Sequence, residues 1–336
     1  MRELDVVLCG YYGFGNLGDE LLAKALVELL CLSGVDRDRI GVLSASPDQT
    51  AGELGVRSED RWSPRSVFRF LSSSRTLLLG GGGLFQDVTS LKSPLYYWGV
   101  TFMARRAGAV PWAFGQSLGP LSSSLGRRLA TRSLGACKVR VLRDAPSVKL
   151  AQSMGIGAVM MAPDPVLALR PNVGERTGAF IGVNVRPTRS VSLKKVAYCI
   201  RDLVLKEGLP VVGLALAEED LLALRDLETF GVRMGDVRLM RSLRDFEAVA
   251  GSLRGTVSMR LHGVVLSVAS RIPCVAIPYD PKVEAFAGQF LVPMSSGDRP
   301  MEFGDPVDVS ALDEAQGALR EAMGLAVSKL GIGGGS

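Results

Sequence analysis

The feature that most constrains the fold of this chain is a regular alternation of short apolar runs with longer amphipathic segments. Leu4–Cys9 is almost continuously apolar, as strands are when both faces of a parallel sheet are covered. Leu21–Leu30 then shows helical periodicity with strong helix formers. The same order recurs across residues 40–161 and 179–277. Strands that alternate with helices predict an α/β protein with parallel sheets.

A chain of 336 residues is long enough for two domains of roughly 150 residues each. The polar, turn-forming stretch 170–178 is the best linker candidate. We therefore expect a Rossmann-like N-terminal domain over residues 1–169 and a second one over residues 178–300. These would be doubly wound domains facing a cleft. The pattern of residues 309–330 predicts an amphipathic C-terminal helix. This helix could pack back on the N-terminal domain.

Two segments in the first half of the chain, residues 49–66 and the glycine run 80–83, interrupt the alternation of strands and helices. Residues 49–66 are polar and rich in turn formers, so we expect a loop there. A strand is expected over Thr76–Leu79, followed directly by four glycines, Gly80–Gly83. Consecutive glycines after a buried strand indicate a backbone that something approaches very closely. A ligand and a neighbouring helix are both open interpretations.

Charge and cysteine usage exclude several classes of protein. Lys and Arg exceed Asp and Glu by 39 to 34, but the basic residues form no run, so a nucleic-acid partner is not expected. This charge leaves a mild bias towards anionic substrates or a membrane surface. Five widely spaced cysteines and a single histidine do not make a metal site, and they suit reduced thiols in the cytoplasm. No signal peptide or membrane-spanning run is expected.

The candidate site is the stretch from Val257 to Lys282, which contains the only histidine, His262. Arg260 precedes it by two residues, at the end of a predicted strand and before a predicted helix. Ligands of open parallel sheets bind at the carboxyl ends of strands, and helix N-termini there attract anions. A single histidine can equally be a hydrogen-bonded core residue. If the segment stays extended, Arg260 and His262 face one cleft.

Further charged residues stand at similar positions along the chain. Arg143 and Arg186 each follow a predicted strand. Asp19 and Glu20 begin the first helix, where they either favour the helix dipole or act as a base and hydroxyl binder. Asp87 follows the glycine run without neighbours at metal-ligand spacing, so no metal is expected.

Six motifs together resemble the polysaccharide pyruvyl transferase family. They are, in order, GYYGFGNLGDE, GGGGLFQD, GQSLGP, LRDAPS, VNVRP and MRLHGVV. The resemblance extends from about residue 5 to residue 290 and is strongest to the bacterial cell-wall branch that prepares secondary polymers for S-layer anchoring. It implies a fold like the B-type glycosyltransferases. It also implies phosphoenolpyruvate as co-substrate, no cofactor, and a pyruvate ketal on a sugar as product. The implied acceptor is a lipid-linked disaccharide ending in N-acetylmannosamine.

The resemblance also implies roles for residues. Arg260 and His262 match the donor site, and Lys282 matches it less firmly. Arg143 and Arg186 match arginines of the family pattern and are expected to bind the donor as well. The acceptor-binding residues expected from the glycine-rich motifs of the N-terminal domain are Asn16, Gly82, Gln86 and Gln116.

The chemistry of these residue types agrees with such a reaction. Arginine forks bind phosphate and carboxylate groups, and lysine binds them as a point charge. A histidine near neutrality can protonate the enol methylene, which makes C2 electrophilic. Asp19 and Glu20 are then the candidate bases on the acceptor side. For a lipid-linked acceptor we expect a cytoplasmic protein that docks peripherally at the inner face of the membrane.

Two other readings remain open at this point. A glycosyltransferase or epimerase that uses a nucleotide sugar could have the same fold, with Glu284 holding the donor ribose. A non-enzymatic sugar-binding protein would normally carry an export signal and more aromatic residues than the 6 % found here.

Overall fold

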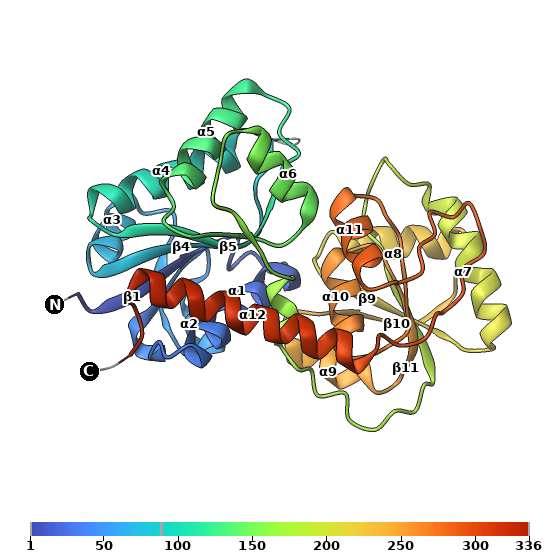
Figure 1. Ribbon diagram of the computed structural model, residues 1–336. Helices are drawn as coiled ribbons and strands as arrows, with labels where there is room; N and C mark the ends of the chain where they lie inside the picture. Colours follow the sequence, from blue (N-terminus) through green and yellow to red (C-terminus); the bar gives the residue numbers. More distant parts are fainter. Residues whose placement is uncertain (1, 88–89, 335–336) are drawn as a thin grey trace. The chain divides into compact units, whose positions relative to one another are not determined.

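The computed structural model describes residues 2–87 and 90–334, which form two parallel sheets of seven and five strands with helices around them (Figure 1). The α/β prediction is confirmed. The chain divides into two compact units. The first contains Met1–Phe14, Leu22–Ala168 and Ala315–Ser336, and the second contains Gly15–Leu21 and Leu169–Glu314.

The sheet of the first unit is doubly wound. Its spatial order is β3 (Arg57–Asp60), β2 (Ile40–Ser44), β1 (Leu4–Cys9), β4 (Ser74–Phe85), β5 (Val110–Leu118), β6 (Arg140–Leu142) and β7 (Met160–Met161). Strand β1 lies inside the sheet and every residue of it is buried, which explains its almost continuously apolar run. The strand order reverses between β1 and β4, and this is the point where such sheets bind ligands.

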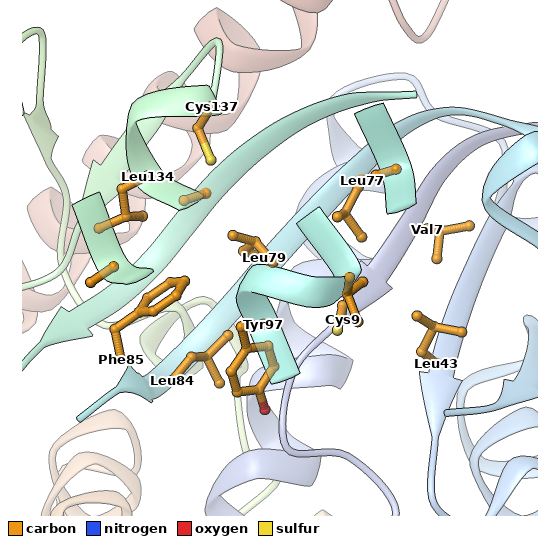
Figure 2. Close-up of a cluster of buried hydrophobic side chains, with 14 of the residues drawn as sticks. Val7, Cys9, Leu43, Leu77, Leu79, Leu84, Phe85, Tyr97, Leu134 and Cys137 are labelled. Carbon is orange, nitrogen blue, oxygen red and sulfur yellow. The ribbon is translucent and has the colours of Figure 1, made fainter. Parts of the chain in front are cut away.

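Helices cover both faces of this sheet. They are α1 (Leu17–Leu32), α2 (Pro47–Leu54), α3 (Pro64–Ser72), α4 (Lys92–Arg106), α5 (Ser124–Ala136), α6 (Ala145–Ser153) and α12 (Val309–Leu330), with 3₁₀ turns η1 (Arg37–Arg39) and η2 (Pro165–Ala168). In Figure 1, α3, α4, α5 and α6 lie on one face, and α1 and α2 lie on the other. Figure 2 shows the core under α4, where Tyr97 meets Phe85 with ring centroids 6.0 Å apart.

The glycine run is part of strand β4, so the prediction that this strand ends at Leu79 was wrong. Gly80 pairs with Phe114 of β5, and the strand continues to Phe85. A Cβ atom on Gly81 would lie 2.9 Å from a methyl carbon of Leu22 in α1. A Cβ on Gly80 would meet the hydroxyl of Tyr12 at 2.6 Å. The glycines therefore let α1 and Tyr12 pack directly on the strand, which agrees with the neighbouring-helix interpretation.

The expected loop over residues 49–66 is also a correction. It contains most of α2, all of β3 and the start of α3. Strand β3 lies at the edge of the sheet, and none of its four residues is fully buried, so its sequence RSED carries no apolar pattern. Polar edge elements of this kind cannot be told from loops by hydrophobic periodicity.

The second unit has a smaller sheet of the same type. Its order is β10 (Met234–Leu239), β9 (Val211–Ala215), β8 (Phe180–Asn184), β11 (Leu253–Ser258) and β12 (Cys274–Ala276). Its helices are α7 (Leu193–Glu207), α8 (Asp220–Thr229), α9 (Leu243–Ala250), α10 (Leu261–Ala269) and α11 (Pro281–Gln289). Here the order reverses between β8 and β11, so the loops that follow these two strands flank the expected ligand position.

Candidate functional site

The carboxyl edge of the second sheet collects charged side chains from four strands. Arg186 follows β8, Asp220 follows β9, Arg260 follows β11 and Lys282 follows β12. Because the carboxyl ends of parallel strands meet at one edge, these four segments converge although up to 96 residues separate them.

Arg260 is held rigidly at this edge. Its Nε donates to both carboxylate oxygens of Asp220 at 2.7 and 2.9 Å, and its Nη2 donates to Asp220 at 2.7 Å. Asp220 is fully buried, while Arg260 is 8 % exposed. Burial lowers the pKa of Arg260, but the carboxylates of Asp220 and Glu219 outweigh this effect and raise the pKa overall. The guanidinium therefore stays charged in a fixed orientation.

A second arginine reaches the same place. Arg186 donates from Nη1 to the hydroxyl of Tyr279 at 3.1 Å, and its guanidinium lies 5.2 Å from the centroid of that ring. Its Nη2 lies 3.2 Å from Oε1 of Glu219, and the same oxygen accepts a hydrogen bond from Arg260 at 2.6 Å. Two guanidinium groups from strands on either side of the switch point thus converge on one carboxylate oxygen.

His262 lies two residues beyond Arg260, but not in an extended segment. Helix α10 begins at Leu261, and Arg260 takes the N-cap position with φ −74° and ψ 135°. The expectation that the chain stays extended through His262 was wrong, because the apolar run after it starts the helix earlier. His262 is therefore a residue of the first helical turn.

The start of the GNLGDE motif packs against His262 within the second unit. A Cβ atom on Gly18 would lie only 2.0 Å from Nδ1 of His262, so any side chain at this position would displace the imidazole. The backbone N–H of Leu17 donates to the carbonyl of Leu216 at 2.9 Å, which ties this segment to the loop after β9. The side chain of Asn16 caps α1 by accepting from the N–H of Gly18 at 3.2 Å.

Asp19 and Glu20 occupy the first turn of α1, directly after Gly18. Both are half-buried and belong, like His262, to the second unit. Lys282 lies in the first turn of α11, where its Nζ is 3.4 Å from Oδ2 of Asp280. Its side chain is one-third exposed, so it can change partner at little cost.

Arg143 lies in the first unit, in a buried polar network. Its Nη1 donates to Asp164 at 2.7 Å and its Nε donates to the hydroxyl of Ser117 at 2.6 Å. The side chains of Arg143 and Asp164 are 4 % and 2 % exposed. This network links β5, β6 and the segment before η2, so the structure does not bring Arg143 into the same unit as Arg260.

The remaining acceptor candidates lie within β4 and β5 of the first unit or directly after β4. Gln116 is fully buried, and its Nε2 donates to the carbonyl of Leu79 at 2.9 Å. Its Oε1 has no hydrogen-bond partner in the part of the chain that the structure describes. Gly82 pairs with Gln116 and has φ 78°, and Gln86 is half-buried just after β4.

Asp87 has a structural role. The N–H and hydroxyl groups of Ser122 and Ser123 donate to its carboxylate at 2.6–2.9 Å. Desolvation acts to raise the pKa of Asp87, but these hydrogen bonds outweigh it and hold the pKa well below 3.8. Across residues 2–87 and 90–334, no three His, Cys, Asp or Glu residues gather closely enough to hold a metal ion.

Sequence reasoning missed the acidic partners of the two arginines. Glu219 and Asp220 stand just after β9, in the segment LALAEED, and two acids at a strand's carboxyl end were the available signal. It also missed Asn184, the last residue of β8, whose Oδ1 accepts from the N–H of Arg260 at 3.0 Å.

Comparison with known proteins decides the family. The family model described as polysaccharide pyruvyl transferase matches residues 16–281. The chain belongs to the polysaccharide pyruvyl transferase family. A search of curated protein sequences finds no match.

Solved structures of similar fold come from enzymes that act on nucleotide sugars and from glycosyltransferases. The UDP-GlcNAc 2-epimerase of Methanocaldococcus jannaschii has a TM-score of 0.58 at 7 % identity, covering 96 % of this chain and 99 % of its own. A glycosyltransferase of Rickettsia africae has 0.57 at 8 %, covering 97 % and 93 %. The Neisseria meningitidis UDP-GlcNAc 2-epimerase bound to UDP-GlcNAc has 0.56 at 10 %, covering 97 % and 99 %. These similarities show the fold, which is that of the B-type glycosyltransferases and epimerases.

In the described part of the chain, no helix is both long enough and apolar enough to cross a membrane.

Proposed function

We propose that this pyruvyl transferase moves the enolpyruvyl group of phosphoenolpyruvate onto a sugar to form a pyruvate ketal and release phosphate. The observation that carries the proposal is the pair of arginines that converge on Glu219 at the switch point of the second sheet, where His262 follows Arg260 in the first turn of α10. Phosphoenolpyruvate carries a phosphate and a carboxylate, and paired guanidinium groups suit both. In this proposal the second unit binds the donor. The acceptor-binding residues are Gly82, Gln86 and Gln116 of the first unit, together with Asn16, which belongs to the second unit.

The reaction balances with groups of this chain. His262, as imidazolium, transfers its proton to the methylene carbon of phosphoenolpyruvate, and C2 becomes an oxocarbenium centre. One sugar hydroxyl adds at C2 and loses its proton to Asp19 or Glu20. Phosphate then leaves with the electron pair of the C2–O bond, and a second hydroxyl adds to close the ketal. The second hydroxyl gives its proton to His262, which restores the imidazolium, and the proton on Asp19 or Glu20 passes to the departing phosphate, which restores the carboxylate.

The arginines stabilise charge during these steps. Arg186, Arg260 and Lys282 hold the donor through its phosphate and carboxylate, and their positive charge favours departure of phosphate. Asp220 supports the reaction indirectly, because its buried carboxylate fixes the plane of the Arg260 guanidinium. Arg143 acts as a positioning residue of the first unit through Asp164 and Ser117.

The acceptor in this proposal is the N-acetylmannosamine residue of a lipid-linked cell-wall polymer precursor, modified at the inner face of the membrane for S-layer anchoring. The family membership supports a saccharide acceptor. Helix α3 supports membrane docking, because it buries Val67 and Phe70 while Phe68, Arg65 and Arg69 are exposed.

Docking can be tested by flotation with anionic liposomes at low and high salt. We expect binding at low salt that fades as salt screens it. Arg69→Glu on α3 should reduce binding, while Arg128→Glu on α5, also exposed, serves as the control. Absence of binding at low salt would contradict this part of the proposal.

The function itself is tested by mass spectrometry of products from phosphoenolpyruvate and a panel of saccharide acceptors, with His262→Asn as the key variant. We expect a mass gain of one ketal pyruvate, and turnover about 10²–10⁴-fold lower for His262→Asn, because asparagine cannot deliver a proton. Calorimetry should show binding of phosphoenolpyruvate and not of UDP sugars. Normal turnover of His262→Asn would remove the acid role, and binding of UDP sugars alone would favour a nucleotide-sugar enzyme.

A further inference from the structure

Glu219 stands where the two arginines of the site converge. A single oxygen, Oε1, is 2.6 Å from Nη2 of Arg260 and 3.2 Å from Nη2 of Arg186. Two positive charges directed at one point are the usual arrangement for an anionic ligand. In this structure a carboxylate of the protein occupies that point.

The side chain of Glu219 is less firmly fixed at the arginines than that of its neighbour Asp220. The side chain of Glu219 is 53 % exposed, whereas that of Asp220 is fully buried. Asp220 also accepts from the backbone N–H groups of Leu216 and Ala217 at 3.0 and 3.2 Å, which fixes its position. The side chain of Glu219 can therefore swing into solvent, while Asp220 stays on Arg260.

Glu219 does not satisfy all the hydrogen-bond donors of the two arginines. Nε of Arg186 is buried and has no hydrogen-bond partner in the ranges that the structure describes. A buried donor without an acceptor costs free energy, and a ligand that satisfies it regains that cost. Phosphate or a phosphate ester presents several acceptor oxygens, so it can use more of these donors than one carboxylate oxygen does.

The charges of the cluster agree with an exchange of anions. Arg186 and Arg260 contribute two positive charges, and Glu219 and Asp220 contribute two negative charges. When the side chain of Glu219 turns away, the two arginines keep one positive charge that Asp220 does not compensate. An incoming anion can compensate that charge. With Glu219 in place, the same anion meets a neutral cluster and a competing carboxylate.

We propose that Glu219 is a built-in competitor, whose carboxylate occupies the position of the substrate's phosphate or carboxylate and moves out when substrate binds. The identity of the anion in this inference rests on the proposed function. The position of the anion rests only on the geometry of the two arginines. Its consequence is that Glu219 weakens ground-state binding of the donor and helps the product phosphate to leave.

The test compares Glu219→Gln with wild-type protein by isothermal titration calorimetry, using phosphoenolpyruvate and inorganic phosphate separately. We expect Kd for both anions to fall about 3–10-fold, because the carboxylate of the competitor is 53 % exposed and solvent screening weakens its ion pairs. The matched control is Glu218→Gln. Glu218 is the adjacent acid, is 81 % exposed, and lies 3.9 Å from Arg241, so its neutralisation should leave both Kd values unchanged.

The outcomes separate this inference from the proposed function. Phosphoenolpyruvate binding that weakens or stays constant in Glu219→Gln overturns the competitor role and leaves the proposed function in place. Tighter binding of inorganic phosphate alone, with no binding of phosphoenolpyruvate by either protein, supports the competitor and overturns the proposed donor. If neither the wild-type protein nor the variant binds either anion, both the competitor role and the proposed function are overturned. Equal tightening in Glu218→Gln overturns the competitor role, because it indicates a general change of charge.

Discussion

A single methyl group added at Gly18 should displace the proposed catalytic acid. The added Cβ would lie 2.0 Å from Nδ1, 2.7 Å from Cγ and 2.9 Å from Cε1 of His262. Ordinary van der Waals contact begins near 3.4 Å, so the imidazole must move by about 1.4 Å at its nearest atom. Gly18 has no left-handed backbone conformation, so alanine causes no backbone strain and the effect is steric.

The expected magnitude follows from this displacement. A misplacement of about 1 Å in a catalytic group can cost about 10²-fold in rate. We therefore expect Gly18→Ala to lower kcat by about 10²-fold, with a much smaller change in the affinity for phosphoenolpyruvate. Overpacking costs typically 1–3 kcal/mol of stability, and higher helix propensity returns up to about 1 kcal/mol. The variant should thus remain folded.

The assay is phosphate release from phosphoenolpyruvate in the presence of a saccharide acceptor, with thermal unfolding measured in parallel. The control is Gly52→Ala in α2, where an added Cβ has no heavy atom within 4 Å. That variant should keep full activity and gain roughly 0.5–1 kcal/mol from helix propensity. A folded Gly18→Ala protein with wild-type kcat would refute the reasoning, because the imidazole would then not need its observed place.

Three further predictions concern stability and reactivity. Asp220→Ala should lower the free energy of unfolding by about 3–5 kcal/mol in urea titrations, because the buried charge of Arg260 loses its main partner; a loss below 1 kcal/mol would contradict this. Hydrogen bonds from two arginines hold the pKa of Asp5 below 3.8 in the folded protein. Asp5 therefore stabilises the fold at pH values above 3.8, and this stability is lost as the pH falls through the lower pKa of the folded state. Asp5→Asn should therefore lose more stability at pH 7 than at pH 3, and equal losses would count against the ion pairs. Thiol titration of the native protein should reach the half-buried Cys31 and Cys199 first, since burial raises the pKa of the other three thiols to about 11 or 12; simultaneous reaction of all five would disprove this order.

The fold was predictable where burial determines the sequence. Strand β1 is covered on both faces, so the predicted apolar run Leu4–Cys9 coincides with its observed bounds. The prediction failed where side chains carry no burial signal. Strand β3 is a polar edge strand. Strand β4 was predicted to end at Leu79, before its glycines, although it continues through them and their lack of side chains is what lets α1 approach.

The site was predictable only in part, for a related reason. The position of a residue at the end of a strand can be inferred from local pattern, and this placed Arg186, Arg260 and Lys282 at one sheet edge. Which acid holds which arginine depends on contacts between segments about 40 residues apart, and no local pattern encodes that pairing. The packing of Gly18 against His262 is an even longer-range contact, and it became evident only from the structure.

The first unit is assembled from pieces at both ends of the sequence, and this affects how it can form during synthesis. Leu319 and Met323 of α12 are fully buried, and Gln316 donates to the carbonyl of Leu167 at 2.9 Å. These partners are separated by the roughly 150 residues of the second unit, which a ribosome needs about 7–30 s to translate at ordinary rates. During that interval the apolar surface that receives α12 is without its cover. Chaperone dependence should therefore be greatest between synthesis of the first sheet and emergence of the last helix.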